Sequence, residues 1–348
     1  MKTFKRFIRV AVATLPFLVA CQPSVAQNLT GAGATFPYPI YSKWFDLYHA
    51  KTGIEINYQS IGSGGGIQQL KAGTVDFGAS DAALSNDRLK EMPRRVLHFP
   101  TVAGALAMVY NLPGLKGPVK LTPEAIVGIY MGKITTWNDR VIAAANPGLS
   151  LPPVPLLPVH RSDGSGTTNI FTTYLSAVSG PWKEMVGANT AVSWPAGVGG
   201  KGNDGVAGLV KQTPGSIGYV ELAYAKQNKL PVAQVRNRVG NFIEPTLEST
   251  TAAVAASAAR LAKDVRTPIV NGAAGGAYPI SGLTFLLVYQ DTKDAARQRA
   301  LANFIDWAIH DGQQYAADLD YARLPEALVH VNEASLKTLT SGGKKVHP

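Results

Sequence analysis

Segments with the periodicity of strands alternate along this chain with segments that have the periodicity of helices. Ile54, Ile56 and Tyr58 occupy alternate positions, which is typical of a half-buried strand. Residues 39–53 carry apolar side chains at helical spacing and end in Gly53, the residue type that most often follows a helix. Strands that alternate with helices predict an α/β protein with mixed or mainly parallel sheets flanked by helices.

Two further helices are expected from the same kind of spacing. Residues 299–312 repeat the design of the first helix, and we expect them to end at Gly312. Residues 167–178 place apolar side chains on one face, and the helix is expected to open at Thr167 or Thr168.

Two long apolar runs, residues 99–112 and 278–290, lie far apart in the sequence. We interpret them as strands that cross between two lobes. On this interpretation one lobe is discontinuous and consists of residues 27–100 plus 276–348, and residues 101–275 form the other lobe. The expected architecture is therefore a two-lobed α/β binding protein of the type II-like periplasmic class, with a ligand cleft between the lobes.

The N-terminus has the layout of a secretory signal peptide. Residues 1–10 carry four basic side chains and no acid, and residues 10–20 form a short apolar run. Ser24 and Ala26 are the small residues of a cleavage site, so residues 1–26 are expected to be removed and the protein to be periplasmic. The segment that ends at Cys21 also resembles a bacterial lipobox, which leaves a lipoprotein anchored through Cys21 as the alternative.

The cysteine count and the charge exclude several classes of site. Cys21 is the single cysteine, so neither an intrachain disulfide nor a cysteine zinc site is expected. The chain carries a formal charge of +10, and four of these charges lie in the leader. The remaining positive charges are scattered, so a nucleic-acid partner is not expected.

Three loops rich in glycine, serine and threonine each precede a helical segment. They cover residues 31–35, 63–66 and 164–167. The first amides of a helix have no partner inside the helix and carry a partial positive charge, so they can bind an anion without a metal. Serine and threonine are also ordinary helix caps, and one such loop alone does not distinguish capping from binding. Three loops in one α/β chain favour an anion site.

Arg161 stands beside the third loop and offers a planar, permanently charged fork to an oxyanion, and Asp163 is placed to brace it. Other motifs fail on their context. Residues 197–202 match the dinucleotide-binding glycine pattern by letter but do not follow a clear strand. Ser165 is not in the nucleophile elbow of α/β hydrolases. His160 is interpreted as a strand residue.

Six blocks occur in order and with ordinary spacing from about residue 29 to about residue 335: LTGAGATFPYPIYSKW, IGSGGGIQQL, VDFGASDAAL, RSDGSGTTNIFTTYL, WPAGVGGKGNDGVAGLV and GSIGYVELAYA. Together they resemble the PstS family, the periplasmic phosphate-binding proteins of phosphate-specific ABC importers. The resemblance implies a receptor that closes on one phosphate, needs no cofactor or metal, is not an enzyme, acts as a monomer and delivers its ligand to membrane permease subunits with a cytoplasmic ATPase.

The resemblance also implies which residues bind phosphate. They are Thr35, Phe36, Ser63, Asp81, Arg161, Ser165, Gly166 and Thr167, with Asp163 in support of the arginine. Phosphate near neutral pH still carries a proton and can donate it to the Asp81 carboxylate, whereas sulfate carries none and is disfavoured there. Two alternatives stay open: a receptor for sulfate or molybdate, and a phosphoester hydrolase that uses Ser63 or Ser165.

Overall fold

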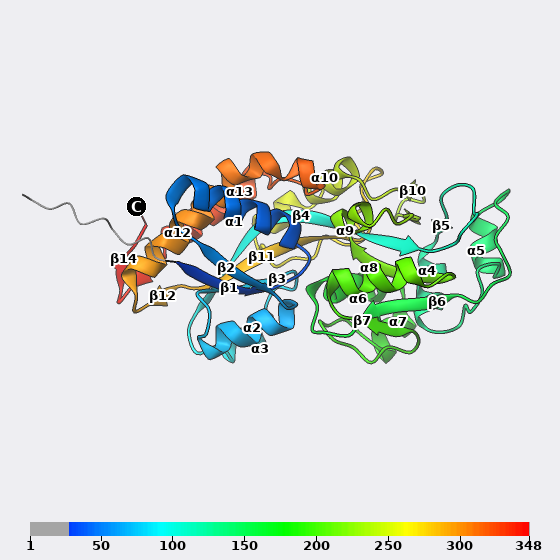
Figure 1. Cartoon of the computed structure of the whole chain (residues 1–348), viewed down its shortest axis with the longest axis horizontal. Helices are drawn as coiled ribbons and strands as arrows, with labels where there is room; N and C mark the ends of the chain where they lie inside the picture. The colour runs from blue at the N-terminus through cyan, green and yellow to red at the C-terminus, as the bar shows by residue number, and fades with distance from the viewer. Residues whose placement is uncertain (1–27, 348) are drawn as a thin grey trace, which may run out of the picture.

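The computed structural model describes residues 28–347, and its centre is one sheet of eight strands in the order β2-β1-β3-β11-β4-β8-β6-β7 (Figure 1). These strands are β1 Leu29–Gly33, β2 Ile56–Ser60, β3 Phe77–Ser80, β4 Val96–Tyr110, β6 Leu157–Arg161, β7 Val198–Gly200, β8 Ser216–Glu221 and β11 Ser281–Tyr289. Two small three-stranded sheets are formed by β5 Lys120–Leu121, β9 Gln234–Arg236 and β10 Phe242–Ile243, and by β12 Asp291–Thr292, β13 Thr340–Ser341 and β14 Lys344–Lys345.

The large sheet is parallel towards both edges and antiparallel in the middle. Strand β1 runs parallel to β2 and β3, and β6 runs parallel to β7 and β8. Strand β11 is antiparallel to β3 and β4, and β4 is antiparallel to β8. The expected mixed α/β architecture is therefore confirmed.

Strands β4 and β11 lie in the middle of the large sheet, and β4 joins its two halves. Residues 96–105 of β4 pair with β11, and residues 106–110 pair with β8. Both strands are almost wholly buried, which explains why they read as continuous apolar runs. Figure 1 shows β1, β2 and β3 towards one end of the molecule and β6 and β7 towards the other, with β4 and β11 between them.

Helices cover the sheet and connect its parallel strands: α1 and α2 follow β1 and β2, and α6 and α8 follow β6 and β7. The helices are α1 Tyr38–Thr52, α2 Ser63–Ala72, α3 Asn86–Lys90, α4 Pro123–Tyr130, α5 Arg140–Ala145, α6 Gly166–Val178, α7 Gly180–Met185, α8 Gly202–Gln212, α9 Leu222–Gln227, α10 Leu247–Ala255, α11 Ala258–Leu261, α12 Ala295–Ile309 and α13 Glu326–Leu336, with 3-10 helices η1 Asp311–Tyr315 and η2 Ala317–Leu319. Within residues 28–347, none of these helices has the length and apolar character needed to span a membrane.

The three helices expected from the sequence, α1, α6 and α12, are all present, but the start of α6 and the end of α12 differ from the prediction. Helix α1 ends as expected, because Gly53 adopts the left-handed conformation and its amide caps the last turn. The predicted end at Gly312 is wrong, since α12 stops at Ile309 and the chain tightens into η1. There the Gln313 amide donates to the carbonyl of Ala308 at 2.9 Å, so a side chain takes the place of a glycine cap. Helix α6 opens at Gly166, earlier than expected.

Candidate functional site

The residues expected at the site follow the carboxyl ends of parallel strands. Thr35 and Asp81 come after β1 and β3, and Arg161 is the last residue of β6. Ser63 begins α2 and Gly166 begins α6, so two helix N-termini face the same region. Strand ends that meet helix starts form the usual place for an anion in an α/β protein.

The loops of the two lobes touch one another at this point. The backbone amide of Gly64 donates to the carbonyl of Gly164 at 2.8 Å, and the amide of Gly166 donates to Ser63 Oγ at 3.0 Å. A side chain on Gly64 would come within 3.0 Å of the Gly164 backbone. A side chain would therefore press against this backbone, and the structure brings the second and third predicted loops into direct contact.

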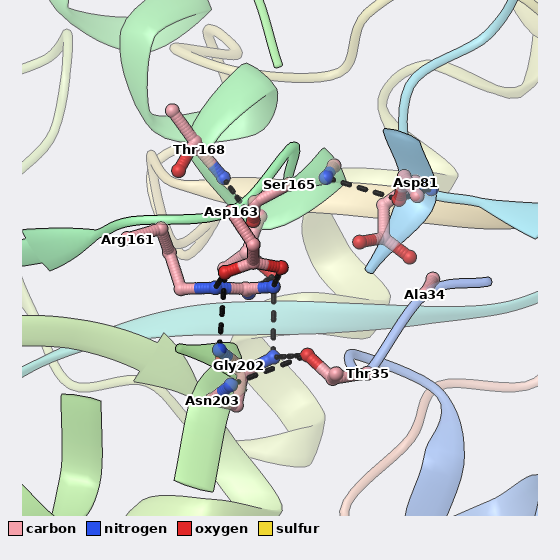
Figure 2. A network of polar contacts seen from close by, with 12 residues as sticks. Ala34, Thr35, Asp81, Arg161, Asp163, Ser165, Thr168, Gly202 and Asn203 are labelled. Atoms are coloured by element: carbon pink, nitrogen blue, oxygen red, sulfur yellow. Dashed lines mark hydrogen bonds and ion pairs between the residues drawn. The ribbon is translucent and has the colours of Figure 1, made fainter. Parts of the chain in front are cut away.

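Arg161 and Asp163 form a buried, two-pronged ion pair (Figure 2). Arg161 Nε and Nη2 donate to the two carboxylate oxygens of Asp163 at 2.7 and 2.6 Å, and the Arg161 side chain is only 1% exposed. The Gly202 amide donates to the same carboxylate at 3.0 Å. Burial opposes the charge of Asp163, but the Arg161 guanidinium outweighs it and lowers the pKa of this carboxyl below its usual value. Asp163 is thus fixed as the brace that the sequence predicts.

Asp81 follows β3, and its carboxyl has one partnered and one unpartnered oxygen. Oδ1 accepts the Thr284 hydroxyl at 2.9 Å, whereas Oδ2 is buried without a hydrogen-bond partner among the described residues. Burial raises the pKa of Asp81 to about 7, although the Thr284 hydroxyl, the positive charge of Arg161 and the nearby hydroxyl and amide of Thr167 all lower it. One oxygen of this buried carboxyl is therefore left without a protein partner among the described residues.

Two hydroxyl groups of the site have both acceptor positions occupied. Ser63 Oγ accepts the backbone amides of Asp81 at 3.3 Å and Gly166 at 3.0 Å. Thr35 Oγ1 accepts the backbone and side-chain amides of Asn203 at 3.2 and 2.7 Å. Because a hydroxyl has two acceptor positions and one proton, each of these groups is left to act as a donor.

Thr167 and Ser165 continue this set of donors at the start of α6. Thr167 Oγ1 accepts from Arg161 Nη1 and from Asn203 Nδ2, each at 3.3 Å. Ser165 is the N-cap of α6, and its Oγ accepts the Thr168 amide at 3.0 Å. Four buried hydroxyls, one arginine and an unpartnered carboxyl oxygen thus lie at the ends of these strands and the starts of these helices. This arrangement suits a ligand that has several acceptor oxygens and one proton to donate.

Phe36 contributes to this region through its backbone, because its side chain belongs to the core. The ring packs edge-to-face with Tyr321, and a side chain on Gly104 of β4 would come within 2.7 Å of it. The residue is fully buried, so its amide is held in a fixed place directly after Thr35.

The structure adds supporting residues that the sequence analysis did not identify. Asn203 links Thr35 to Thr167, and its Oδ1 also accepts the Glu221 amide at 2.9 Å. Gly202 and Asn203 begin α8, directly after β7, which lies inside the glycine-rich segment 197–202. As interpreted, this segment does not follow a strand. The sequence signal for these two residues is a fourth glycine-rich turn before a helix. Thr284 lies in β11 and carries no local signal.

His160 is a strand residue, as interpreted. Its Nδ1 lies 3.1 Å from the neighbouring carbonyl of Arg161, and its ring stacks on Trp194 with centroids 4.8 Å apart. Burial lowers its pKa below the usual value. Within residues 28–347, histidine, cysteine, aspartate and glutamate form no group of three or more that is placed to hold a metal ion.

Comparisons with known proteins agree with this architecture. Residues 19–311 match the family model described as the PBP superfamily domain. The chain is 48% identical to the phosphate-binding protein PstS of Xylella fastidiosa strain Temecula1 over 317 residues, which cover 90% of this chain and 86% of the relative. It is 44% identical to the PstS protein of Pasteurella multocida over 335 residues, or 96% of each chain.

Solved structures with lower identity share the fold. A phosphate-binding protein from Stenotrophomonas maltophilia superimposes with a TM-score of 0.66 at 20% identity, and the match covers 92% of this chain and 96% of the other. A phosphate ABC transporter substrate-binding protein from Clostridium perfringens, solved with bound phosphate, gives a TM-score of 0.62 at 18% identity over 86% of this chain and all of the other. The family model and the two curated relatives place the chain in the PBP superfamily and, within it, in the PstS family of phosphate-binding proteins.

Proposed function

We propose that this chain captures inorganic phosphate between its lobes and delivers it to the permease of an ABC importer for ATP-driven uptake. Its curated relatives are named as phosphate-binding proteins. The observation that carries the proposal is the unpartnered Oδ2 of Asp81, which stands among donors from both lobes. A phosphate that still holds a proton matches this set, because its oxygens accept from the donors and its hydroxyl donates to Asp81.

The protein groups that bind phosphate in this proposal come from the three glycine-rich loops and from the ends of β3 and β6. Thr35, Phe36 and Ser63 supply hydroxyl and amide donors from the first lobe, and Asp81 supplies the acceptor. Arg161 supplies the positive charge. Ser165, Gly166 and Thr167 supply donors at the start of α6, and Asp163 keeps the arginine in place.

A receptor for sulfate or molybdate is the nearest alternative, and Asp81 argues against it. A fully deprotonated oxyanion brings an acceptor to the Asp81 oxygen and leaves both groups without a proton to share. An unsatisfied buried polar group costs about 1–3 kcal/mol, which corresponds to roughly 5- to 150-fold in affinity.

A serine-dependent hydrolase receives less support from the contacts of the two serines. A nucleophilic serine needs a base that accepts its proton. Ser63 Oγ is held by two backbone amides, and Ser165 Oγ caps α6. His160 is held beside Trp194 by stacking. These contacts support a role of both serines as hydrogen-bond donors to a ligand.

The test is a calorimetric titration of the purified protein with phosphate and with sulfate across pH. We expect wild type to prefer phosphate, and Asp81→Asn to lose more of this preference than of its phosphate affinity, since the amide can donate to either ligand. Asp311→Asn, which changes an exposed acid paired with Lys51, is the control and should leave the preference unchanged. Equal binding of both anions by wild type would refute the assigned role.

Closure and delivery complete the proposal. We assign residues 27–100 and 276–348 to one lobe and residues 101–275 to the other, with motion at β4 and β11. A closed, loaded form presents the permease with a shape that differs from the empty form. We place the protein in the periplasm as a monomeric receptor that takes up a phosphate anion and no nucleic acid. The expected cleavage after Ala26 and the alternative lipid on Cys21 lie outside the described residues.

A further inference from the structure

Three consecutive carbonyl groups in the first loop each accept a hydrogen bond from a tyrosine hydroxyl. Tyr58 donates to the carbonyl of Ala34 at 2.8 Å, Tyr224 to that of Thr35 at 2.6 Å, and Tyr321 to that of Phe36 at 2.7 Å. The three tyrosines come from β2, from α9 and from the segment after η2. Elements far apart in the sequence therefore converge on the backbone of one short loop.

These bonds determine where the amides of the loop point. In a trans peptide the N–H group points away from the carbonyl of the same plane. Tyr58 thus orients the N–H of Thr35, because this group shares a peptide plane with the Ala34 carbonyl, and Tyr224 orients the N–H of Phe36 in the same way. Neither amide donates to a protein acceptor among the described residues, although Thr35 and Phe36 are both buried.

We propose that Tyr58 and Tyr224 are positioning residues for ligand binding, which hold the carbonyls of Ala34 and Thr35 so that the amides of Thr35 and Phe36 face the anion. Tyr321 supports them by anchoring the far side of Phe36, because the Phe36 carbonyl shares its peptide plane with Pro37, which has no N–H to orient. This inference rests on the proposed function, since it explains how that site aims its backbone donors. A loop without such bonds would have to order its peptides when the ligand arrives, and this ordering reduces affinity.

Glu221 completes the arrangement by supplying a proton. Its Oε2 lies 3.0 Å from the Tyr321 hydroxyl oxygen, which also lies 2.7 Å from the Phe36 carbonyl oxygen. The Tyr321 hydroxyl has one proton, but two oxygens lie within hydrogen-bond distance of it, the Phe36 carbonyl oxygen and Glu221 Oε2. If Glu221 is protonated, it donates to Tyr321, and Tyr321 is free to donate to Phe36.

The surroundings of Glu221 favour this neutral form. Its side chain is fully buried, and Oε1 has no hydrogen-bond partner among the described residues. Burial raises the pKa of Glu221 well above its usual range, and the Tyr321 hydroxyl and the Ala223 amide offset this only in part. Glu221 is therefore assigned a positioning role that acts through Tyr321, because it contacts the Tyr321 hydroxyl and not the loop itself.

The first experiment compares Tyr224→Phe with a matched control. Tyr289→Phe removes the same kind of bond, from a buried tyrosine hydroxyl to the Leu70 carbonyl at 2.9 Å, at a peptide that is not in the loop. We expect Tyr224→Phe to weaken phosphate binding about 3- to 10-fold by calorimetry, which is the worth of one hydrogen bond. Tyr289→Phe should lower the unfolding midpoint to a similar extent and leave the dissociation constant unchanged.

A spectroscopic measurement separates positioning from general stability. In protein labelled with ¹⁵N-phenylalanine, the Phe36 amide proton should move strongly downfield when phosphate binds to wild type. The Phe36 signal is assigned from its loss in Phe36→Leu. The movement should be smaller in Tyr224→Phe and unchanged in Tyr289→Phe.

The role of Glu221 is tested by two variants. The Ala223 amide and the Tyr321 hydroxyl both contact Oε2 of Glu221. A glutamine with its nitrogen at this position can still donate to Tyr321, although it cannot accept the Ala223 amide, whereas alanine can do neither. Glu221→Gln should therefore retain more phosphate affinity than Glu221→Ala, and Tyr321→Phe should resemble Glu221→Ala.

The outcomes distinguish the inference from the function on which it rests. If wild type does not bind phosphate, the proposed function fails and the tyrosines are not at issue. If wild type binds phosphate but the Tyr58, Tyr224 and Tyr321 variants bind it as tightly, with an unchanged movement of the Phe36 amide, the inference is overturned and these tyrosines serve the core alone.

Discussion

At the scale of single residues, the site depends on which groups hold protons. The hydroxyls of Ser63, Thr35 and Thr167 are occupied as acceptors by N–H groups, so their protons are directed elsewhere. Asp81 is the matching acceptor, and burial keeps the pKa of its carboxyl near 7. A ligand that carries one proton and several oxygens satisfies both sides of this arrangement, which explains why an acid belongs beside an arginine at an anion site.

The raised pKa of Asp81 predicts how the stability of the ligand-free protein depends on pH. The folded form binds more protons than the unfolded form between the unfolded pKa near 4 and the folded value of about 7. The contribution of Asp81 is therefore fully present below pH 4 and is lost as the pH rises to 7, by at most about 4 kcal/mol. Urea unfolding of wild type and Asp81→Asn at pH 4 to 8 should show that the variant lacks this loss.

The quantity to compare is the difference in unfolding free energy between Asp81→Asn and wild type, because His98 also titrates in this pH range. His98 accepts the Leu84 amide at 2.9 Å, and burial lowers its pKa to about 4. Its unfolded form binds the extra proton, so this contribution rises between pH 4 and 6.5 and opposes that of Asp81 in the same window. Subtracting the two curves cancels His98, and a flat difference from pH 4 to 8 would show that Asp81 has an ordinary pKa.

Two ion pairs of the same form allow a test of the Asp163 brace. Arg161–Asp163 and Arg266–Asp264 both make two bonds between residues two positions apart, but the first pair is buried and the second is partly exposed. Asp163→Asn should lower the free energy of unfolding by about 3 kcal/mol, because it leaves a buried guanidinium without its counter-charge. Asp264→Asn should cost less than about 1 kcal/mol. Equal losses in denaturant titrations would mean that the buried pair has no special role.

At the scale of elements, the important contact is that between the start of α6 and the end of β3. A side chain at Gly166 would lie 2.5 Å from Oδ2 of Asp81 and 2.6 Å from its backbone nitrogen. The backbone at Gly166 does not require glycine, since it is not in the left-handed region. Glycine is needed at this position because the start of α6 packs closely against the end of β3, and not because of the helix backbone conformation.

This geometry predicts a variant that folds but does not close. Gly166→Ala should leave the unfolding of the ligand-free protein nearly unchanged, because separation of the lobes relieves the contact. Phosphate binding should fall about 10- to 100-fold, the range expected for one added methyl group in a tight place. Gly208→Ala on α8, where a side chain meets nothing within 4 Å, is the control. Calorimetry that finds the same affinity in both variants would contradict the proposed closure.

The elements also show how far the sequence predicts the site. Loops that carry their own signal were identified, as with the glycines, serine and threonine before α6 and the arginine beside it. Asn203 and Thr284 were missed, because neither has a local sequence signal. Asn203 contacts Thr35, which lies 168 positions away in the sequence, and Thr284 contacts Asp81, which lies 203 positions away. The three tyrosines were missed for the same reason, because aromatic residues at strand and helix spacing read as core.

At the scale of the whole molecule, the two lobes share one sheet. Strand β4 pairs with β11 along one part of its length and with β8 along the other, so no strand edge separates the lobes. The apolar runs predicted two long strands, because a strand buried on both faces reads as continuous hydrophobic sequence. The strand order was beyond prediction, since it depends on pairings between segments as distant as β3 and β11.

The shared sheet predicts that ligand binding stabilises both lobes together. At a free phosphate concentration of 100 times the dissociation constant, binding to the native state alone adds about 2.7 kcal/mol. If the lobes unfold as one unit, the slowest-exchanging amides of β1 in one lobe and of β6 in the other should gain this same amount. Hydrogen exchange followed by mass spectrometry measures both in one sample, with sulfate as the control. A gain confined to peptides of one lobe would show that the lobes unfold separately and that phosphate is held mainly by one of them.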